Sequence, residues 1–234
     1  MEIIDLSQEI YDGMPVYKVL PEVKIGIHAS HEEWNGEEII GEPTPSVYKL
    51  EMSEHTGTHV DALSHMRKED KGKSIDTMPL SMFYTEGLCL DFSEKGLKEI
   101  ITSEEIQQKL KDIDETLKAG DTILLHTGHY QKHFNTENWP SGPGISAEAA
   151  RWMGKHGISA FGVETMSPGV PKISNKEVHH ICGELGFTHY ENMINLDKLV
   201  GRGRFRFCAF PLKIRGGTGS PVRAVAIFDQ SQNF

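Results

Sequence analysis

Histidine and acidic residues gather between His55 and His65, where their types and spacing could do chemistry. His55, His59 and Asp61 form the pattern H-x3-H-x-D, and His65 follows four residues after the aspartate. Two neutral imidazoles and a carboxylate suit Zn²⁺, Mn²⁺ or Fe²⁺, and a coordination position left open for water is typical of catalytic sites. The stretch therefore predicts a metal centre with room for a reactive water molecule.

The backbone that lets these groups converge is expected to be an extended strand. On a helix, at about 100° per residue, Asp61 would lie roughly 120° from the face that His55 and His59 share. On a strand alternate side chains face one side, so all three would line one face. The residues between them are largely β-branched, which favours extended backbone. Gly57 would then leave room for an ion between the two imidazoles.

A second cluster of histidine and acid lies far along the chain. His179 and His180 fall on a predicted helix, and His189 and Glu191 follow it. We expect one of the two adjacent histidines, together with Glu191, to reach the first cluster and form a second metal position. The spacing alone does not choose between His179 and His180.

Strands and helices that must position these residues alternate along part of the chain. Ser146 and the pair Thr102–Ser103 are typical helix N-caps, and Gly186 is a typical helix end. Because strands outnumber helices, the pattern predicts a single domain of the mixed α/β class over residues 1–234. Predicted strands cover 2–6, 46–51, 88–92, 122–125, 159–163, 206–210 and 221–228; predicted helices cover 102–113, 147–153 and 176–185; turns fall at 12–13 and 41–43.

Composition limits the classes of partner. The net charge is −10 and no Lys/Arg-rich run offsets it, so neither nucleic acid nor an anionic membrane surface is an expected partner. Three cysteines, an odd number without C-x-x-C spacing, argue against a disulfide framework. The N-terminus lacks a signal-peptide pattern, and no apolar run approaches the ~20 residues of a membrane span. We therefore expect a soluble cytoplasmic protein.

The order of its motifs resembles the cyclase family, which includes bacterial kynurenine formamidase (arylformamidase) and isatin hydrolase. The family signature H-x-G-T-H-x-D-x-P-x-H matches residues 55–65, with Leu63 in place of the proline. Further resemblances run nearly from end to end and lie at 5–7, 13–17, 120–128, 190–196, 211–212 and 219–224.

The resemblance implies a swivelling β/β/α fold, usually a homodimer or a larger homo-oligomer, with one or two zinc ions, or manganese, in each chain. The family's spacing between the helix histidine and the glutamate selects His179. His65 matches the residue that donates and accepts protons. The implied metal ligands, of which the aspartate and the glutamate would bridge two ions, are His55, His59, Asp61, His179 and Glu191.

The implied activity is hydrolysis of a small-molecule amide, with an N-formyl-aryl amide such as N-formyl-kynurenine as the leading substrate. Two alternatives are a hydrolase of a cyclic amide or lactone such as isatin, and a metal-binding protein of the same fold without turnover. Tyr17 stands where arylformamidases carry a substrate-stacking tryptophan, so it is expected to contact the substrate. Glu164 stands where aspartate is usual, and both departures bear on the identity of the substrate.

Other hydrolytic chemistries receive less support from the residues. A serine triad on an α/β-hydrolase fold would need a G-x-S-x-G elbow, which does not occur. Cys182 is near the two helix histidines, but a small buried helix residue is its commoner role. The run from His126 to His129 follows a predicted buried strand and is expected to line a pocket or to be hydrogen-bonded.

Overall fold

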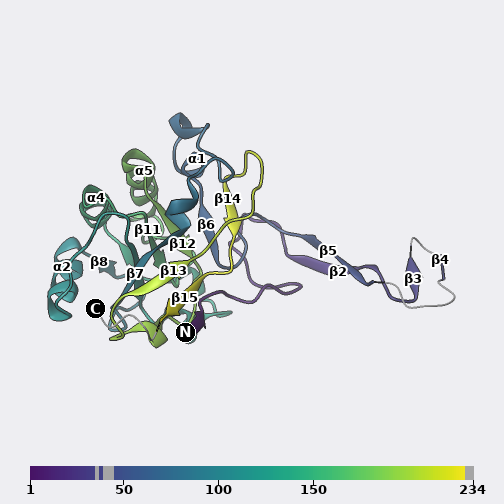
Figure 1. The fold of residues 1–234 in the computed structure, drawn as a ribbon, viewed down its shortest axis with the longest axis horizontal. Coiled ribbons are helices and arrows are strands. Elements are labelled where there is room, and N and C mark those ends of the chain that lie inside the picture. The colour runs from purple at the N-terminus through teal and green to yellow at the C-terminus, as the bar shows by residue number, and fades with distance from the viewer. Residues whose placement is uncertain (35–36, 39–44, 230–234) are drawn as a thin grey trace.

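A nine-stranded mixed sheet dominates the computed structural model, which describes residues 1–34, 37–38 and 45–229 (Figure 1). Its order is β1-β15-β13-β7-β9-β11-β12-β6-β14, in which β7, β9, β11 and β12 are parallel and the other neighbours are antiparallel. The strands span Glu2–Asp5 (β1), His59–Asp61 (β6), Tyr84–Asp91 (β7), Thr122–His126 (β9), Ala160–Val163 (β11), Thr188–Glu191 (β12), Phe205–Cys208 (β13), Gly219–Pro221 (β14) and Val225–Phe228 (β15).

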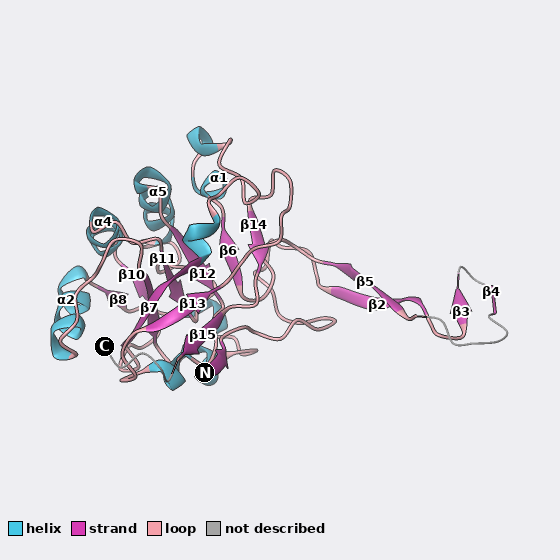
Figure 2. Ribbon diagram, viewed as in Figure 1, coloured by secondary structure: helices cyan, strands magenta, loops and turns pink. Residues whose placement is uncertain are grey.

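Three helices, α2, α4 and α5, pack side by side and bury one hydrophobic core against the sheet (Figure 2). Helix α2 begins after Thr102 with a capping box to Glu105, and α4 begins after Ser146, whose hydroxyl accepts from the Ala149 amide. Helix α5 ends at Gly186, which has a φ of +78°. The helices span Leu63–Met66 (α1), Ser103–Asp112 (α2), His129–His133 (α3), Ala147–Lys155 (α4) and Asn175–Leu185 (α5), with 3₁₀ turns at Lys68–Asp70, Leu80–Phe83, Trp139–Ser141 and Leu196–Leu199.

The sheet curls around a second hydrophobic core on its other face. The rings of Tyr190 on β12 and Phe207 on β13 lie 5.0 Å apart, although β11, β9 and β7 separate the two strands in the sheet. Ser7, just after β1, also bridges to Met193, just after β12. The curl therefore brings one antiparallel end of the sheet back towards the strands that carry the histidine-rich stretch.

Residues 221–228, predicted as one strand, form parts of two strands in the structure. β14 pairs with β6, whereas β15 pairs with β1 and β13. Between β14 and β15 the chain connects the two ends of the curled sheet. The Val222 amide donates to the Thr58 carbonyl, beside β6, and the Ala224 carbonyl accepts from the Leu6 amide, beside β1. Closure of the sheet thus overrides the local strand pattern.

A long hairpin arm projects from the body of the molecule (Figure 1). It consists of β2 (Lys24–Ala29) and β5 (Val47–Glu51), with the short strands β3 (Glu33–Trp34) and β4 (Glu37–Glu38) further out. Ile27, Tyr48 and Leu50 on this arm are 64%, 57% and 54% exposed. The turn predicted at 41–43 lies outside the described residues. An isolated two-stranded hairpin is marginally stable in water.

Two smaller findings complete the fold. Strands β8 (Ile100–Ile101) and β10 (Gly144–Ile145) form a short parallel pair beside the main sheet. No helix in the described part of the chain is long and apolar enough to cross a membrane.

Candidate metal centre

The first histidine cluster sits partly on a turn and only partly on a strand, which corrects the extended geometry predicted for it. Strand β6 contains only His59 to Asp61, and His55 reaches the site from the preceding turn. The physical reason is Gly57, which has a φ of +62° that side chains disfavour. A Cβ at Gly57 would lie 3.1 Å from the Ile10 side chain, so this glycine permits the turn and does not open a gap for an ion.

Asp61 lies at the centre of the site and is 1% exposed. Its Oδ1 is 2.8 Å from Nδ1 of His55 and 3.5 Å from Nε2 of His59. Its Oδ2 is 3.6 Å from Nε2 of His65 and 3.7 Å from Nε2 of His179. The two oxygens of one carboxylate therefore face two separate groups of imidazoles.

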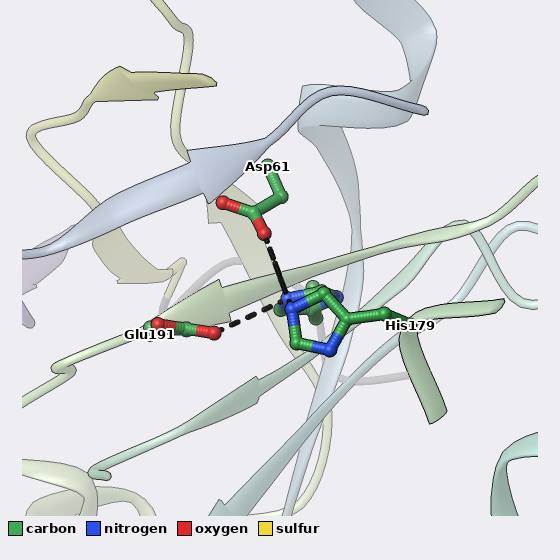
Figure 3. Close-up of side chains that lie close together, drawn as sticks. Asp61, His179 and Glu191 are labelled. Carbon is green, nitrogen blue, oxygen red and sulfur yellow. Dashed lines mark ion pairs between the residues drawn. The ribbon is translucent and has the colours of Figure 1, made fainter. Parts of the chain in front are cut away.

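Glu191 faces the same two groups from the neighbouring strand. β12 runs antiparallel to β6 and places Glu191 opposite His59, with 3.5 Å between Oε2 and Nε2. Helix α5 directs His179 towards the carboxylates and leaves His180 exposed, which resolves the choice that spacing left open. In Figure 3 the side chains of Asp61, His179 and Glu191 point into one space.

Hydrogen bonds orient two of the imidazoles with their free nitrogens towards the carboxylates. Nδ1 of His59 is 2.9 Å from the Gly57 carbonyl, and Nδ1 of His179 is 2.8 Å from the Asn175 carbonyl. Because a carbonyl only accepts, each Nδ1 carries a hydrogen, and in the neutral ring Nε2 then presents a lone pair. Lone pairs that face carboxylate oxygens repel them unless a cation lies between.

The spacing of these atoms also fits a cation. Two ligands that bind one ion tetrahedrally at about 2.1 Å lie about 3.4 Å apart. The Asp61 oxygens stand 3.5 Å from His59 and 3.7 Å from His179, beyond ordinary hydrogen-bond distances. Burial would favour a neutral acid, yet the surrounding histidines, His189 first, hold the pKa of Asp61 well below its usual value. The residues present therefore fit divalent ions.

Ligand atoms converge in two overlapping groups. The first group, which could hold one ion at a first metal position, consists of His55, His59 and Asp61. The second group contains Asp61, His179 and Glu191, as predicted, and adds His189, which the sequence reasoning left outside the site. A signal for it was present, since His189 and Glu191 alternate on one strand and share a face.

A chain of hydrogen bonds holds His55 from outside the metal centre. Nε2 of His55 is 3.0 Å from the Thr218 hydroxyl, which in turn donates to Oε1 of Glu54. The hydroxyl therefore accepts from Nε2 of His55, while Nδ1 of His55 lies within hydrogen-bond distance of Oδ1 of Asp61, at 2.8 Å. Gly219 makes this approach possible, because a Cβ there would lie 2.7 Å from the His55 ring.

Replacing Thr218 by valine is expected to weaken metal binding at the first position by about 10–100-fold, because partners that orient a ligand histidine are worth that much. Isothermal titration with zinc measures the change. Thr218→Ser restores the hydroxyl and should restore the affinity, whereas Thr136→Val, at an exposed turn, should leave it unchanged. Equal affinity in Thr218→Val and the original protein would contradict this role.

His65 lies on α1 at the edge of the site and fits a proton carrier. Its ring centre is 4.4 Å from that of His55 and 5.8 Å from that of His179. Burial lowers the pKa of His65 in spite of the opposing charge of Asp61. The ring is therefore mainly neutral at pH 7 and can accept a proton.

A cavity of about 230 Å³ opens over the metal centre. His65 and the metal-facing side chains form its polar side, and Pro15, Val16 and Leu20 contribute to an apolar side. Tyr17 also lines the cavity and is 42% exposed. The cavity thus offers both apolar contacts and polar groups to a small molecule.

Cys182 is buried in the core, and burial raises the pKa of its thiol although the neighbouring His189 opposes this. A thiol that stays protonated is a poor nucleophile, which favours the structural role expected for it.

Glu164 and His126 form a buried pair at the ends of neighbouring strands. Oε2 of Glu164 accepts from the amide and hydroxyl of Thr127, and Oε1 lies 3.4 Å from Nδ1 of His126. Although burial favours the neutral forms, the pair lowers the pKa of Glu164 and raises that of His126. Neither residue lines the cavity above the metal centre. His129 is likewise hydrogen-bonded, to the Trp139 carbonyl.

Replacing His126 by leucine is expected to destabilise the protein by about 3–5 kcal/mol, because it leaves the Glu164 carboxylate buried without its cation. The loss should be largest between the ordinary pKa values of 4.5 for Glu164 and 6.5 for His126, where both are charged. It should shrink in acid as Glu164 takes up a proton. Urea unfolding at several pH values measures it, with the exposed His28→Leu as control; a pH-independent loss would contradict the pairing.

Comparisons with known proteins agree with this fold. A family model described as putative cyclase matches residues 4–170. A kynurenine formamidase of Bacillus cereus is 31% identical over 227 residues, which cover 96% of each chain. Isatin hydrolase A of Ralstonia solanacearum is 25% identical with a TM-score of 0.81, over 96% of this chain and 91% of that one. Isatin hydrolase A of Labrenzia aggregata shares the fold, with 23% identity and a TM-score of 0.85 over 97% of this chain and 94% of that one.

Proposed function

The chain belongs to the cyclase family, and from that membership we propose that it is a metal-dependent amidohydrolase that cleaves an N-formyl-aryl amide, N-formyl-kynurenine being the first substrate to test. The observation that carries the proposal is that Asp61 and Glu191 each face two groups of imidazoles at the separations of ligands around an ion. The half-apolar cavity above them supports a substrate with an aromatic ring and an amide.

Zinc is the proposed ion, with manganese as the alternative, because imidazole and carboxylate ligands suit both. His55, His59 and Asp61 would hold the first ion, and His179 and Glu191, with Asp61 as a bridge, would hold the second. A bound ion supplies Lewis acidity and lowers the pKa of water to about 7.

The protein's own groups would bind the substrate and move the proton. Tyr17 and the apolar side of the cavity would hold the aromatic ring, so that the formyl carbonyl lies above the carboxylates. His65, neutral at pH 7, would accept a proton at Nε2 from the attacking water and return it to the leaving nitrogen. Addition of water and cleavage of the C–N bond then give formate and an aryl amine.

The deciding experiment measures hydrolysis of N-formyl-kynurenine and of isatin on one sample whose zinc and manganese contents are determined. Release of formate by the metal-loaded protein, lost on chelation and restored by the metal, is the expected result. Bound metal without hydrolysis of either compound would contradict the proposal and support a metal-binding protein without turnover.

A cyclic amide or lactone is the second candidate substrate. It is favoured by the TM-score of 0.81 to an isatin hydrolase that is 25% identical, and by Tyr17, which replaces the stacking tryptophan expected of arylformamidases. Ring opening of isatin faster than deformylation, judged by kcat/KM, would select it.

We also propose that residues 1–234 form a single domain and that the protein is a homodimer. Its proposed location is the cytoplasm. The exposed apolar side chains of the β2–β5 arm support the dimer, since a second copy would cover them. The three free cysteines support a reducing compartment. Light scattering on the purified protein tests the dimer.

A further inference from the structure

His189 is the most enclosed histidine of the metal centre. It is 0% exposed and packs on β12 between two rings, with centroids 5.6 Å from Phe161 and 4.8 Å from His179. Neither of its ring nitrogens has a hydrogen-bond partner among the residues that the structure describes. An unpaired buried polar group costs about 1–3 kcal/mol, so this arrangement requires a physical reason.

The surroundings of Nε2 of His189 supply that reason. It lies 3.2 Å from Oδ2 of Asp61 and 3.3 Å from Oε1 of Glu191, yet its orientation makes a hydrogen bond to neither. A charged imidazolium that neutralised these acids would make a charge-assisted bond at about 2.7–2.9 Å. Separations near 3.4 Å with the nitrogen directed between the oxygens are instead those of ligands around one ion.

We propose that His189 is the fourth protein ligand of the second metal position, and that this position is thereby closed. One ligand atom from each of Asp61, His179, His189 and Glu191 lies within 4.8 Å of all the others. Four protein ligands are typical of structural zinc, whereas three with an open place are typical of catalytic zinc.

The two metal positions would therefore have different roles, one catalytic and one structural. The first, with His55, His59 and Asp61, keeps a place for a reacting water, and the second holds the shared carboxylates in place. This inference goes beyond the proposed function, because it does not depend on which amide is cleaved.

The test compares metal binding in His189→Ala, His189→Gln and His179→Ala, with the exposed His180→Ala as the matched control. The original protein and His180→Ala should each bind two zinc ions per chain, measured by mass spectrometry after dialysis at buffered free zinc. Each of the other three variants should bind one. Their second ion should bind at least about 100-fold more weakly, since even the outer partners of ligands are worth about 10–100-fold.

Cobalt absorption tests the coordination itself, because tetrahedral Co²⁺ absorbs far more strongly than octahedral Co²⁺. Filling both positions of the original protein should give a stronger band than filling the first alone, and both His189 variants should lose that added intensity. His189→Gln keeps a polar side chain of similar size, so it provides the result if the alanine variant does not fold by circular dichroism.

Two zinc ions bound with unchanged affinity in either folded His189 variant would overturn the proposal, as would a single ion in the original protein. Failure of the proposed function looks different. If the His189 variants bind one ion where the original protein binds two, and the original protein hydrolyses no amide, the role of His189 still stands. Only the proposed amide-cleaving activity is then contradicted.

Discussion

Replacing Asp61 by alanine is expected to remove metal from both positions and to reduce hydrolysis at least about 1000-fold. The two oxygens of Asp61 face both imidazole groups, Oδ1 towards His55 and Oδ2 towards His179. Without it, each position loses a negatively charged ligand, and the Lewis acid is lost with the ion. Even a single group that stabilises a developing oxyanion is worth about 10²–10³ in rate.

The Asp61→Ala experiment measures metal content and kcat/KM on the same preparation. Asp61→Asn keeps the shape of the side chain but not its charge, so it should lose most of the metal as well. Glu69→Ala, which removes an exposed carboxylate near the site in sequence, is the control and should retain both properties. Full zinc content together with full activity in Asp61→Ala would show that the metal centre lies elsewhere.

Replacing His65 by asparagine should leave the bound metal in place and lower kcat by about 10²–10⁴, the usual contribution of a positioned acid or base. His65 stands 3.6 Å from Asp61 on the open side of the site, and its side chain is more exposed than those of the other site histidines. Its removal therefore takes away proton transfer and not a ligand.

The pH dependence of kcat separates these roles of His65. A base must be neutral to accept a proton, and burial lowers the pKa of His65 from its ordinary value of 6.5. Activity of the original protein should therefore fall only when the pH drops below about 6.5. His65→Asn should lack that acid limb; a variant that loses its zinc, or keeps the limb, would show that His65 has another role.

Local signals in the sequence predicted the three long helices, α2, α4 and α5, but not the short helices α1 and α3. The N-caps at Thr102 and Ser146 and the end at Gly186 act within one or two turns of chain, and the structure confirms all three. By contrast, the split of 221–228 into two strands depends on which distant strands each half meets. No local pattern contains that information.

The candidate site was likewise predictable where local spacing defines it and not where it depends on the pairing of distant strands. The H-x3-H-x-D spacing brought His55, His59 and Asp61 together correctly, but its geometry was wrong, because the positive φ of Gly57 turns the chain. His189 was missed because its role depends on β12 lying beside β6, a register that the sequence does not display. Alternation on one strand would have placed it beside Glu191, although not beside Asp61.

The wide spacing along the chain of the residues that build the metal centre has a consequence for the order of events during synthesis. The metal centre needs His55 from a turn near the N-terminus, Glu191 from β12 and the support of Thr218, so a growing chain cannot form it until nearly all residues have emerged. Contacts between such distant residues form slowly. Metal binding is therefore expected to be a late event in folding. A chain truncated before Thr218 should bind its metal more weakly than the full chain.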